Sequence, residues 1–119
     1  YVQIISSERG RESERDYNRV SYASRMMKVL ARELGIPIIL LAQLSRKADE
    51  REGAPKLSDL KESGSLEQDA DIVLLLWKKA SSPEDRVLTI AKQRNGRVGD
   101  IELSFDGATS KFKRKPVLN

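Results

Sequence analysis

Apolar residues recur at steps of three and four between residues 16 and 34, which is the spacing of one face of an α-helix. The residues on this face are Val20, Ala23, Met26, Met27, Leu30, Ala31 and Leu34. The pattern predicts an amphipathic helix over residues 16–34, with charged side chains on its opposite face in solvent. Gly35 and Pro37 follow and end the helix, because glycine suits the residue just past a helix and proline cannot continue one.

Three apolar runs predict strands of a parallel sheet. Residues 1–5 form a short run with β-branched side chains, whereas residues 36–43 and 72–77 are almost unbroken in apolar character. Such continuous runs are typical of central parallel strands that helices cover on both faces. The order strand, helix, strand, loop, strand therefore predicts an α/β fold.

The C-terminal part of the chain predicts antiparallel pairing instead. Residues 86–93 and 98–105 alternate between apolar and polar side chains. Asn95-Gly96 lies between them and is a strong hairpin signal, because both residues tolerate the positive φ angles of a tight turn. Phe112 is expected in a last short strand. We therefore expect parallel core strands extended by a C-terminal antiparallel hairpin.

Composition narrows the possible chemistry. The 119 residues include neither cysteine nor histidine, which excludes disulfides, metal sites built from these residues and nucleophiles activated by histidine. The length suits one domain or part of one. No apolar run approaches the ~18–20 residues of a membrane span, so we expect no membrane partner. Absence of cysteine fits a reducing compartment, and we expect a cytoplasmic protein.

The net charge of +4 is concentrated near the C-terminal end. Residues 1–110 carry equal numbers of basic and acidic side chains, and the excess comes from Lys111, Lys113, Arg114 and Lys115. We divide the chain into a domain of residues 1–113 and a basic tail of residues 114–119. Two interpretations of the basic residues remain open: a solubilising tail, or a contact with a polyanion.

Three polar clusters lie at the ends of the predicted strands. Gln43 ends the strand 36–43, the charged stretch 61–71 precedes the strand 72–77, and Lys92 and Arg94 lie at the tip of the hairpin. Taken singly, each has an ordinary structural explanation as a satisfied or solvated polar end. Ligands of open α/β sheets bind beyond the carboxyl ends of strands, however, which makes these clusters candidates for a site.

Together the clusters carry a resemblance. The motifs "AQLSR", "SDLKESGSLEQDAD" and "AKQRNG", in this order and spacing, resemble the C-terminal half of the motor domain of DnaB-type replicative DNA helicases. The likeness spans nearly all of residues 1–113. It implies part of a RecA-like fold of the P-loop NTPase type. It also implies a homohexamer that couples hydrolysis of ATP with Mg²⁺ to translocation on single-stranded DNA and duplex unwinding. Primase and a helicase loader are the further partners that the family implies.

The resemblance also implies roles for three residues around the nucleotide. Gln43 matches a position that senses the γ-phosphate, and its amide can donate to a phosphate oxygen. Lys92 and Arg94 match the pair that reaches into the nucleotide of the neighbouring subunit. Arginine suits this task, because its forked and permanently charged guanidinium matches the charge spread over phosphoryl oxygens.

The long central motif resembles the DNA-binding loop of the central channel. Lys61, Glu62 and Gly64 match the positions that touch the DNA backbone, where small residues and free N–H groups approach a phosphate closely. We interpret the whole charged run as a loop at the mouth of the sheet. Its acidic residues are expected to pair with basic groups and hold the loop in register; they are Glu67, Asp69 and Asp71.

The phosphate-binding motif G-x-x-x-x-G-K-[ST] does not occur within residues 1–119. We therefore expect this segment to bind no ATP, Mg²⁺ or other metal by itself and to be inactive without the rest of the protein. Two alternatives to a helicase motor remain. One is a non-catalytic DNA-binding or ring-assembly module, and the other is a recombinase-like ATPase that does not unwind DNA.

Overall fold

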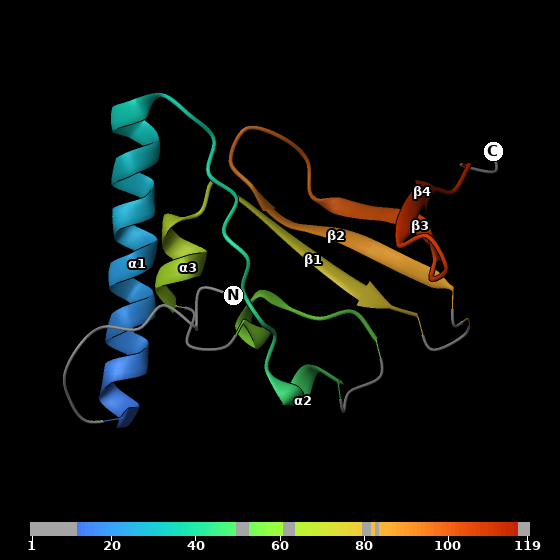
Figure 1. Cartoon of the computed structure of the whole chain (residues 1–119), viewed down its shortest axis with the longest axis horizontal. Helices are drawn as coiled ribbons and strands as arrows, with labels where there is room; N and C mark the ends of the chain where they lie inside the picture. Colours follow the sequence, from blue (N-terminus) through green and yellow to red (C-terminus); the bar gives the residue numbers. More distant parts are fainter. Residues whose placement is uncertain (1–11, 50–52, 61–63, 80–81, 83, 117–119) are drawn as a thin grey trace. The chain divides into compact units, whose positions relative to one another are not determined.

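A computed structural model of the chain shows two compact units (Figure 1). It describes residues 12–49, 53–60, 64–79, 82 and 84–116. The first unit contains residues up to Ala48 together with Leu57–Ala70, and the second contains Asp49–Lys56 together with the chain from Asp71 onward. The strand expected at residues 1–5 lies outside the described residues.

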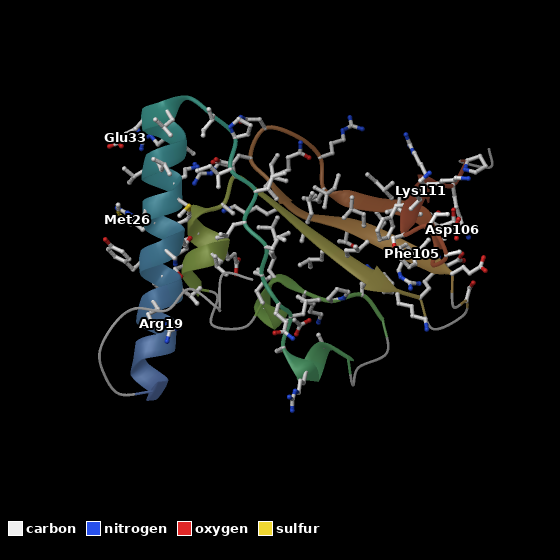
Figure 2. The ribbon with its side chains drawn as sticks, in the orientation of Figure 1. Arg19, Met26, Glu33, Phe105, Asp106 and Lys111 are labelled. Carbon is white, nitrogen blue, oxygen red and sulfur yellow. The ribbon has the colours of Figure 1, made fainter. Side chains whose placement is uncertain are left out.

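The first unit is built on a long amphipathic helix. Helix α1 spans Glu12–Leu34, and thus starts earlier than the sequence predicts. Val20 and Ala23 are buried against Leu66 of the short helix α3, which spans Gly64–Asp69 and lies beside α1 (Figure 1). Other residues of the predicted apolar face are less covered. Met26 is 42% exposed and, like Glu33, projects from the side of α1 opposite α3 (Figure 2).

Helix α1 ends as the sequence predicts. Gly35 has a φ of 63°, the left-handed conformation that glycine adopts without a steric penalty. The N–H of Ile36 donates to the carbonyl oxygen of Ala31 over 3.1 Å, which closes the Schellman arrangement typical of helix C-termini.

The apolar segment 36–43 was expected to be a buried parallel strand, and that prediction is wrong for the described structure. The segment has no regular secondary structure, and Ile39 and Leu41 are 89% and 66% exposed. A strand exists only through hydrogen bonds to a neighbouring strand. Among the described residues this part of the chain makes such a pairing only just beyond the segment, where Leu44 forms an isolated bridge with Leu60.

Two short helical pieces follow this bridge. Helix α2 spans Arg46–Asp49, and a 3₁₀ turn spans Leu57–Asp59. The N–H of Ser45 donates to the carbonyl oxygen of Asp59 over 2.7 Å, which fixes the start of α2 beside the 3₁₀ turn. A loop was expected between the segments 36–43 and 72–77, so α2 is an element that the sequence pattern did not reveal.

The second unit is an antiparallel sheet with the strand order β1-β2-β3-β4. Its strands are β1 (Ile72–Lys78), β2 (Asp85–Gln93), β3 (Gly99–Asp106) and β4 (Lys111–Arg114) (Figure 1). Every pair of neighbours is antiparallel, so the parallel strands that were expected are not among the described residues. The described part is an α/β structure in which helices and sheet belong to different units.

Strand β1 was expected to be buried on both faces, which is also wrong. Val73 and Leu75 are buried, whereas Ile72, Leu74 and Leu76 are about half exposed. Side chains alternate between the two faces of a strand, so only one face of β1 is covered. A continuous apolar run thus identified the strand correctly but not its surroundings.

The hairpin prediction is confirmed, although its turn differs from the expected one. Strands β2 and β3 pair from Asp85–Ser104 to Ile90–Gly99. Asn95 and Gly96 have no positive φ, whereas Gly99 does, with a φ of 157°. Because β2 ends at Gln93 and β3 begins at Gly99, the connection is longer than the two-residue turn that Asn-Gly favours.

The predicted last strand around Phe112 is confirmed as β4. The rings of Phe105 and Phe112 pack across β3 and β4 with centroids 4.7 Å apart. The guanidinium of Arg86 lies 5.2 Å from the centroid of the Phe105 ring. Figure 2 shows Phe105, Asp106 and Lys111 gathered at this end of the sheet. Beyond β4, Lys115 Nζ lies 2.6 Å from a carboxylate oxygen of Asp85.

Two side-chain contacts on this sheet shift a pKa. Lys79 Nζ donates to Glu102 Oε1, and this hydrogen bond, together with the charge of Glu102, raises the pKa of Lys79 above 10.5. Asp106 accepts hydrogen bonds from the Thr109 hydroxyl at 2.7 Å and the Ala108 N–H at 3.0 Å. These bonds favour the charged carboxylate and lower the pKa of Asp106 below 3.8.

Candidate functional site

Strand β2 carries the candidate cations at its C-terminal end. The β1–β2 ladder pairs Val73 with Lys92 and then Leu74 with Ile90, which leaves Ala91 as an additional residue on β2. An additional residue of this kind locally bends a strand and redirects the side chains that follow it. The half-buried Lys92 therefore lies just past a bulge.

Arg94 follows β2 directly and is held by Asp71, the residue that precedes β1. The N–H of Arg94 donates to the carbonyl oxygen of Asp71 over 3.1 Å. The side chains also form an ion pair, with 3.3 Å between Arg94 Nη1 and Asp71 Oδ1. Arg94 is therefore attached to Asp71 once through its backbone and once through its guanidinium, and both side chains are 55% exposed. The expectation that Asp71 pairs with a basic group is confirmed, and the structure supplies the partner.

Gln43 is exposed and lies in the first unit. It immediately precedes the Leu44–Leu60 bridge. The polypeptide around Gln43 is therefore attached to the stretch that leads into residues 61–63. Lys61 and Glu62, two of the expected DNA contacts, lie outside the described residues.

Gly64 is the first residue of helix α3, although the whole charged run was expected to be a loop. The prediction of a loop is wrong for residues 64–69. Helix α3 is attached to α1 by polar contacts as well as by Leu66. The Ser21 hydroxyl donates to the Ser65 hydroxyl, and the Ser24 hydroxyl donates to Asp69 Oδ2, each over 2.8 Å. These contacts were not predictable from periodicity, since serine on a helix is ordinarily solvated.

Asp69 is more deeply buried than Asp71, the other aspartate of the charged stretch 61–71. Its side chain is 17% exposed, and its Oδ1 lies 4.0 Å from Arg25 Nη1. The hypothesis that Asp69 pairs with a basic group is therefore supported by a long contact with Arg25. The short hydrogen bond from Ser24 is the stronger of the two attachments.

The described candidate residues are divided between the two units. Gln43 and Gly64 belong to the first unit, whereas Lys92 and Arg94 belong to the second. Each group offers hydrogen-bond donors suited to phosphate: an amide and backbone N–H groups in the first, cations in the second. Within the described ranges, no three acidic side chains come together in a way that could hold a metal ion. The described helices include none that is long and apolar enough to cross a membrane.

Comparison with known proteins identifies the family. Residues 1–114 match the family described as "DnaB-like helicase C terminal domain". The chain belongs to this family. The match covers both units, including the β2 end with Arg94 and the segment around Gln43. The resemblance that the sequence motifs carried is therefore confirmed.

Relatives with curated names are replicative helicases. The "Probable plasmid replicative DNA helicase" of Chlamydia muridarum is 45% identical over 113 residues, and the "Replicative DNA helicase DnaB" of Geobacillus stearothermophilus is 45% identical over 119 residues. Each alignment covers 94% of this chain but only 24% and 26% of the relatives, respectively. This chain of the DnaB-like family thus spans about a quarter of the length of these helicases.

Solved structures agree with the family assignment. The chain resembles a protein described in "The Structure Of A DnaB-Like Replicative Helicase And Its Interactions With Primase" with a TM-score of 0.82 and 39% identity. A second solved structure, described as an ATPase domain, matches with the same TM-score and identity. The matches cover 94% of this chain and 28% and 41% of the two structures. The fold is therefore that of a portion of a DnaB-like ATPase domain.

Proposed function

We propose that this chain is part of the motor domain of a hexameric replicative DNA helicase, which couples ATP hydrolysis to translocation on single-stranded DNA and duplex unwinding. The observation that carries the proposal is Arg94, mounted at the end of β2 and tethered to Asp71, in a member of the DnaB-like family. A cation that must meet a phosphate in one geometry needs such a rigid mount.

In this proposal Arg94 and Lys92 act on the nucleotide of the neighbouring subunit. Rings assemble through head-to-tail contacts, so each subunit presents one surface to the next nucleotide and receives its neighbour's surface on the other side. Arg94 stabilises the negative charge on the transferred phosphoryl group, and Lys92 adds a second positive charge. Bound ATP with Mg²⁺ supplies the phosphoryl group, and other parts of the intact protein hold the metal.

Gln43 and the DNA-binding loop form the second part of the proposal. The Gln43 amide donates to the γ-phosphate, and Lys61, Glu62 and Gly64 contact the DNA backbone. The Leu44–Leu60 bridge connects the two, because it fixes the residue after Gln43 to the residue before Lys61. Loss of the γ-phosphate would thus be transmitted to the DNA contacts over a short stretch of chain.

The remaining expectations belong to the same proposal. We infer that the intact protein has the parallel core of a RecA-like domain, in which segment 36–43 finds strand neighbours. The primase named with one of the similar structures supports primase as a partner, and a helicase loader is expected alongside it. The 119 residues alone are expected to be inactive and to bind no ATP or Mg²⁺.

The experiment compares two arginine variants of the intact protein. Arg94→Ala should reduce DNA-stimulated ATP hydrolysis on the order of 10³-fold, because an arginine of this kind stabilises the transition state. Arg97→Ala is the matched control, since Arg97 is exposed on the same connection and has no assigned role. Light scattering should show that both variants retain the ring.

Strand displacement by the intact wild-type protein tests the alternatives. A helicase separates a forked duplex when ATP is supplied. Hydrolysis without separation would favour the recombinase-like ATPase, and DNA binding without hydrolysis would favour the non-catalytic module. Wild-type hydrolysis by Arg94→Ala would refute the role of Arg94.

A further inference from the structure

Asp71 and Arg94 make two contacts, one through the backbone and one through the side chains. The Arg94 N–H group donates to the Asp71 carbonyl oxygen over 3.1 Å, and Arg94 Nη1 lies 3.3 Å from Asp71 Oδ1. Both residues flank the paired ends of β1 and β2, where Ile72 pairs with Gln93. The carboxylate is therefore carried by the same two strands that carry the guanidinium.

This ion pair contributes little to stability, because both side chains are 55% exposed. In an exposed ion pair, solvent screens the attraction between the charges. The entropy that two ordered side chains lose offsets most of what remains. Its effect is on geometry instead. An arginine side chain has many rotamers in solvent, and a carboxylate fixed on the adjoining strand reduces their number before any ligand arrives.

We propose that Asp71 is a positioning residue that orients the Arg94 guanidinium toward the phosphate of the neighbouring subunit. The proposal rests on the proposed function of Arg94. The carboxylate contacts Nη1, and a guanidinium has five N–H donors, so others can serve the phosphate. The Arg94 side chain is thereby ordered before the reaction, so it does not lose its rotational freedom during the reaction step.

The neighbouring carboxylate Asp69 shows what a purely structural acid looks like in this chain. Its side chain is 17% exposed, it accepts a hydrogen bond from Ser24, and its contact with Arg25 is long at 4.0 Å. Asp71 is instead half exposed, contacts Arg94 at 3.3 Å and lies outside the helical unit. The exposed pair is thus the one suited to orient a reactive cation.

The test uses four variants of the intact protein. They are Asp71→Ala, Asp71→Asn, Arg94→Ala and the double variant that combines Asp71→Ala with Arg94→Ala. Asp71→Ala should lower kcat of DNA-stimulated ATP hydrolysis on the order of tenfold with little change in KM, because misorientation affects the transition state most. Asp71→Asn should recover part of the loss, since its amide oxygen still accepts from Arg94. Glu102→Ala is the control, because it breaks the comparably exposed pair with Lys79 on the same sheet.

The double variant separates positioning from structure. Without Arg94 there is nothing to orient, so adding Asp71→Ala to Arg94→Ala should change kcat no further. Wild-type hydrolysis by Arg94→Ala would refute the proposed role of Arg94, on which the positioning role rests. A strong loss with Arg94→Ala but wild-type hydrolysis with Asp71→Ala would refute the positioning role alone. The positioning role would also be overturned if Asp71→Ala lowered kcat by the same factor with and without Arg94. A lowered Tm that accounts for the loss would likewise show a structural role.

Discussion

Two carboxylates only two positions apart have different surroundings in this chain. Asp69 ends helix α3 and is fastened to α1 through Ser24, whereas Asp71 precedes β1 and contacts Arg94. The division falls at Ala70, where the helical unit gives way to the sheet. The sequence alone does not distinguish the surroundings of these two residues, because both are aspartates in the same charged stretch.

Reversing the charge of Asp69 should destabilise the first unit. In Asp69→Lys the hydroxyl of Ser24, a residue that is 5% exposed, loses its acceptor, at a cost of about 1–3 kcal/mol. Denaturant unfolding of the intact protein measures this loss, and DNA-stimulated hydrolysis should weaken with it. Glu33→Lys on the exposed side of α1 is the control and should leave both unchanged. Unaltered stability and hydrolysis in Asp69→Lys would remove this role.

Gly35 provides a second test at the residue scale. Gly35→Ala should cost about 1–2 kcal/mol, because its φ of 63° brings an added Cβ close to the following carbonyl oxygen. Nothing outside the glycine's chain neighbours lies within 4 Å of that Cβ, so the penalty is conformational. Gly107→Ala is the matched control, since the nearest such atom to its Cβ is a ring carbon of Phe105 at 4.0 Å. Equal stability of the two variants, measured by thermal unfolding, would contradict the assignment.

The lowered pKa of Asp106 predicts a pH dependence. A carboxylate whose pKa is lower in the folded state stabilises that state above its unfolded pKa of about 3.8, and the contribution is lost as the pH falls through the folded pKa. Asp106→Asn should therefore be less stable than the wild type at neutral pH, with the difference shrinking in acid. Thermal unfolding across pH ~2–7 measures it, with Asp100→Asn as a comparison. A difference that is constant with pH would contradict the prediction.

At the scale of elements, local patterns predicted what local interactions determine. Helix α1 was expected from its periodic apolar residues and its end from Gly35, and both depend on contacts between residues close in sequence. The hairpin was expected for the same reason. Segment 36–43 was mispredicted because strand formation depends on a distant neighbour, which an apolar run does not specify. The bulge at Ala91 was likewise unpredictable, since it is a property of the pairing and not of one strand.

The bulge leads to a prediction about β2. Deleting Ala91 should restore an uninterrupted ladder in which Lys92 still pairs with Val73, and should remove the local bend that the bulge gives to the end of β2. The straightened strand should displace Arg94 from Asp71, and hydrolysis by the intact protein should fall on the order of tenfold, as expected for Asp71→Ala. Ala91→Gly keeps the number of residues and is the matched control. Wild-type hydrolysis by the deletion variant would contradict this account of the bulge.

On the scale of the whole molecule, each unit exposes apolar surface that a complete domain would cover. Ile39 and Leu41 are exposed in the first unit, and Ile72, Leu74 and Leu76 are about half exposed in the second. Contiguous apolar surface of this kind marks an interaction face. This surface is consistent with the chain's match to about a quarter of the length of replicative helicases. Under the proposed function, the candidate DNA and nucleotide contacts act together in the intact protein.

A prediction at this scale concerns the 119-residue chain without the rest of the protein. It should show no ATP hydrolysis above background and only weak, salt-sensitive binding to single-stranded DNA, because ring helicases sum a few phosphate contacts over several subunits. Turnover assays and fluorescence anisotropy at low and high salt measure these properties. Light scattering should show no hexamer. Hydrolysis above background or a sharp hexamer peak would contradict the proposed dependence on the intact protein.

In the proposed function, Arg94 acts on the nucleotide of a neighbouring subunit, whereas Gln43 acts on the nucleotide of its own subunit. Rings assembled from equal amounts of Gln43→Ala and Arg94→Ala subunits of the intact protein test it most directly. Random mixing leaves about a quarter of the head-to-tail interfaces with both residues present, so hydrolysis should recover well above either parent. Mixed rings no more active than the two parents would contradict the claim, because the two residues would then be needed in the same subunit.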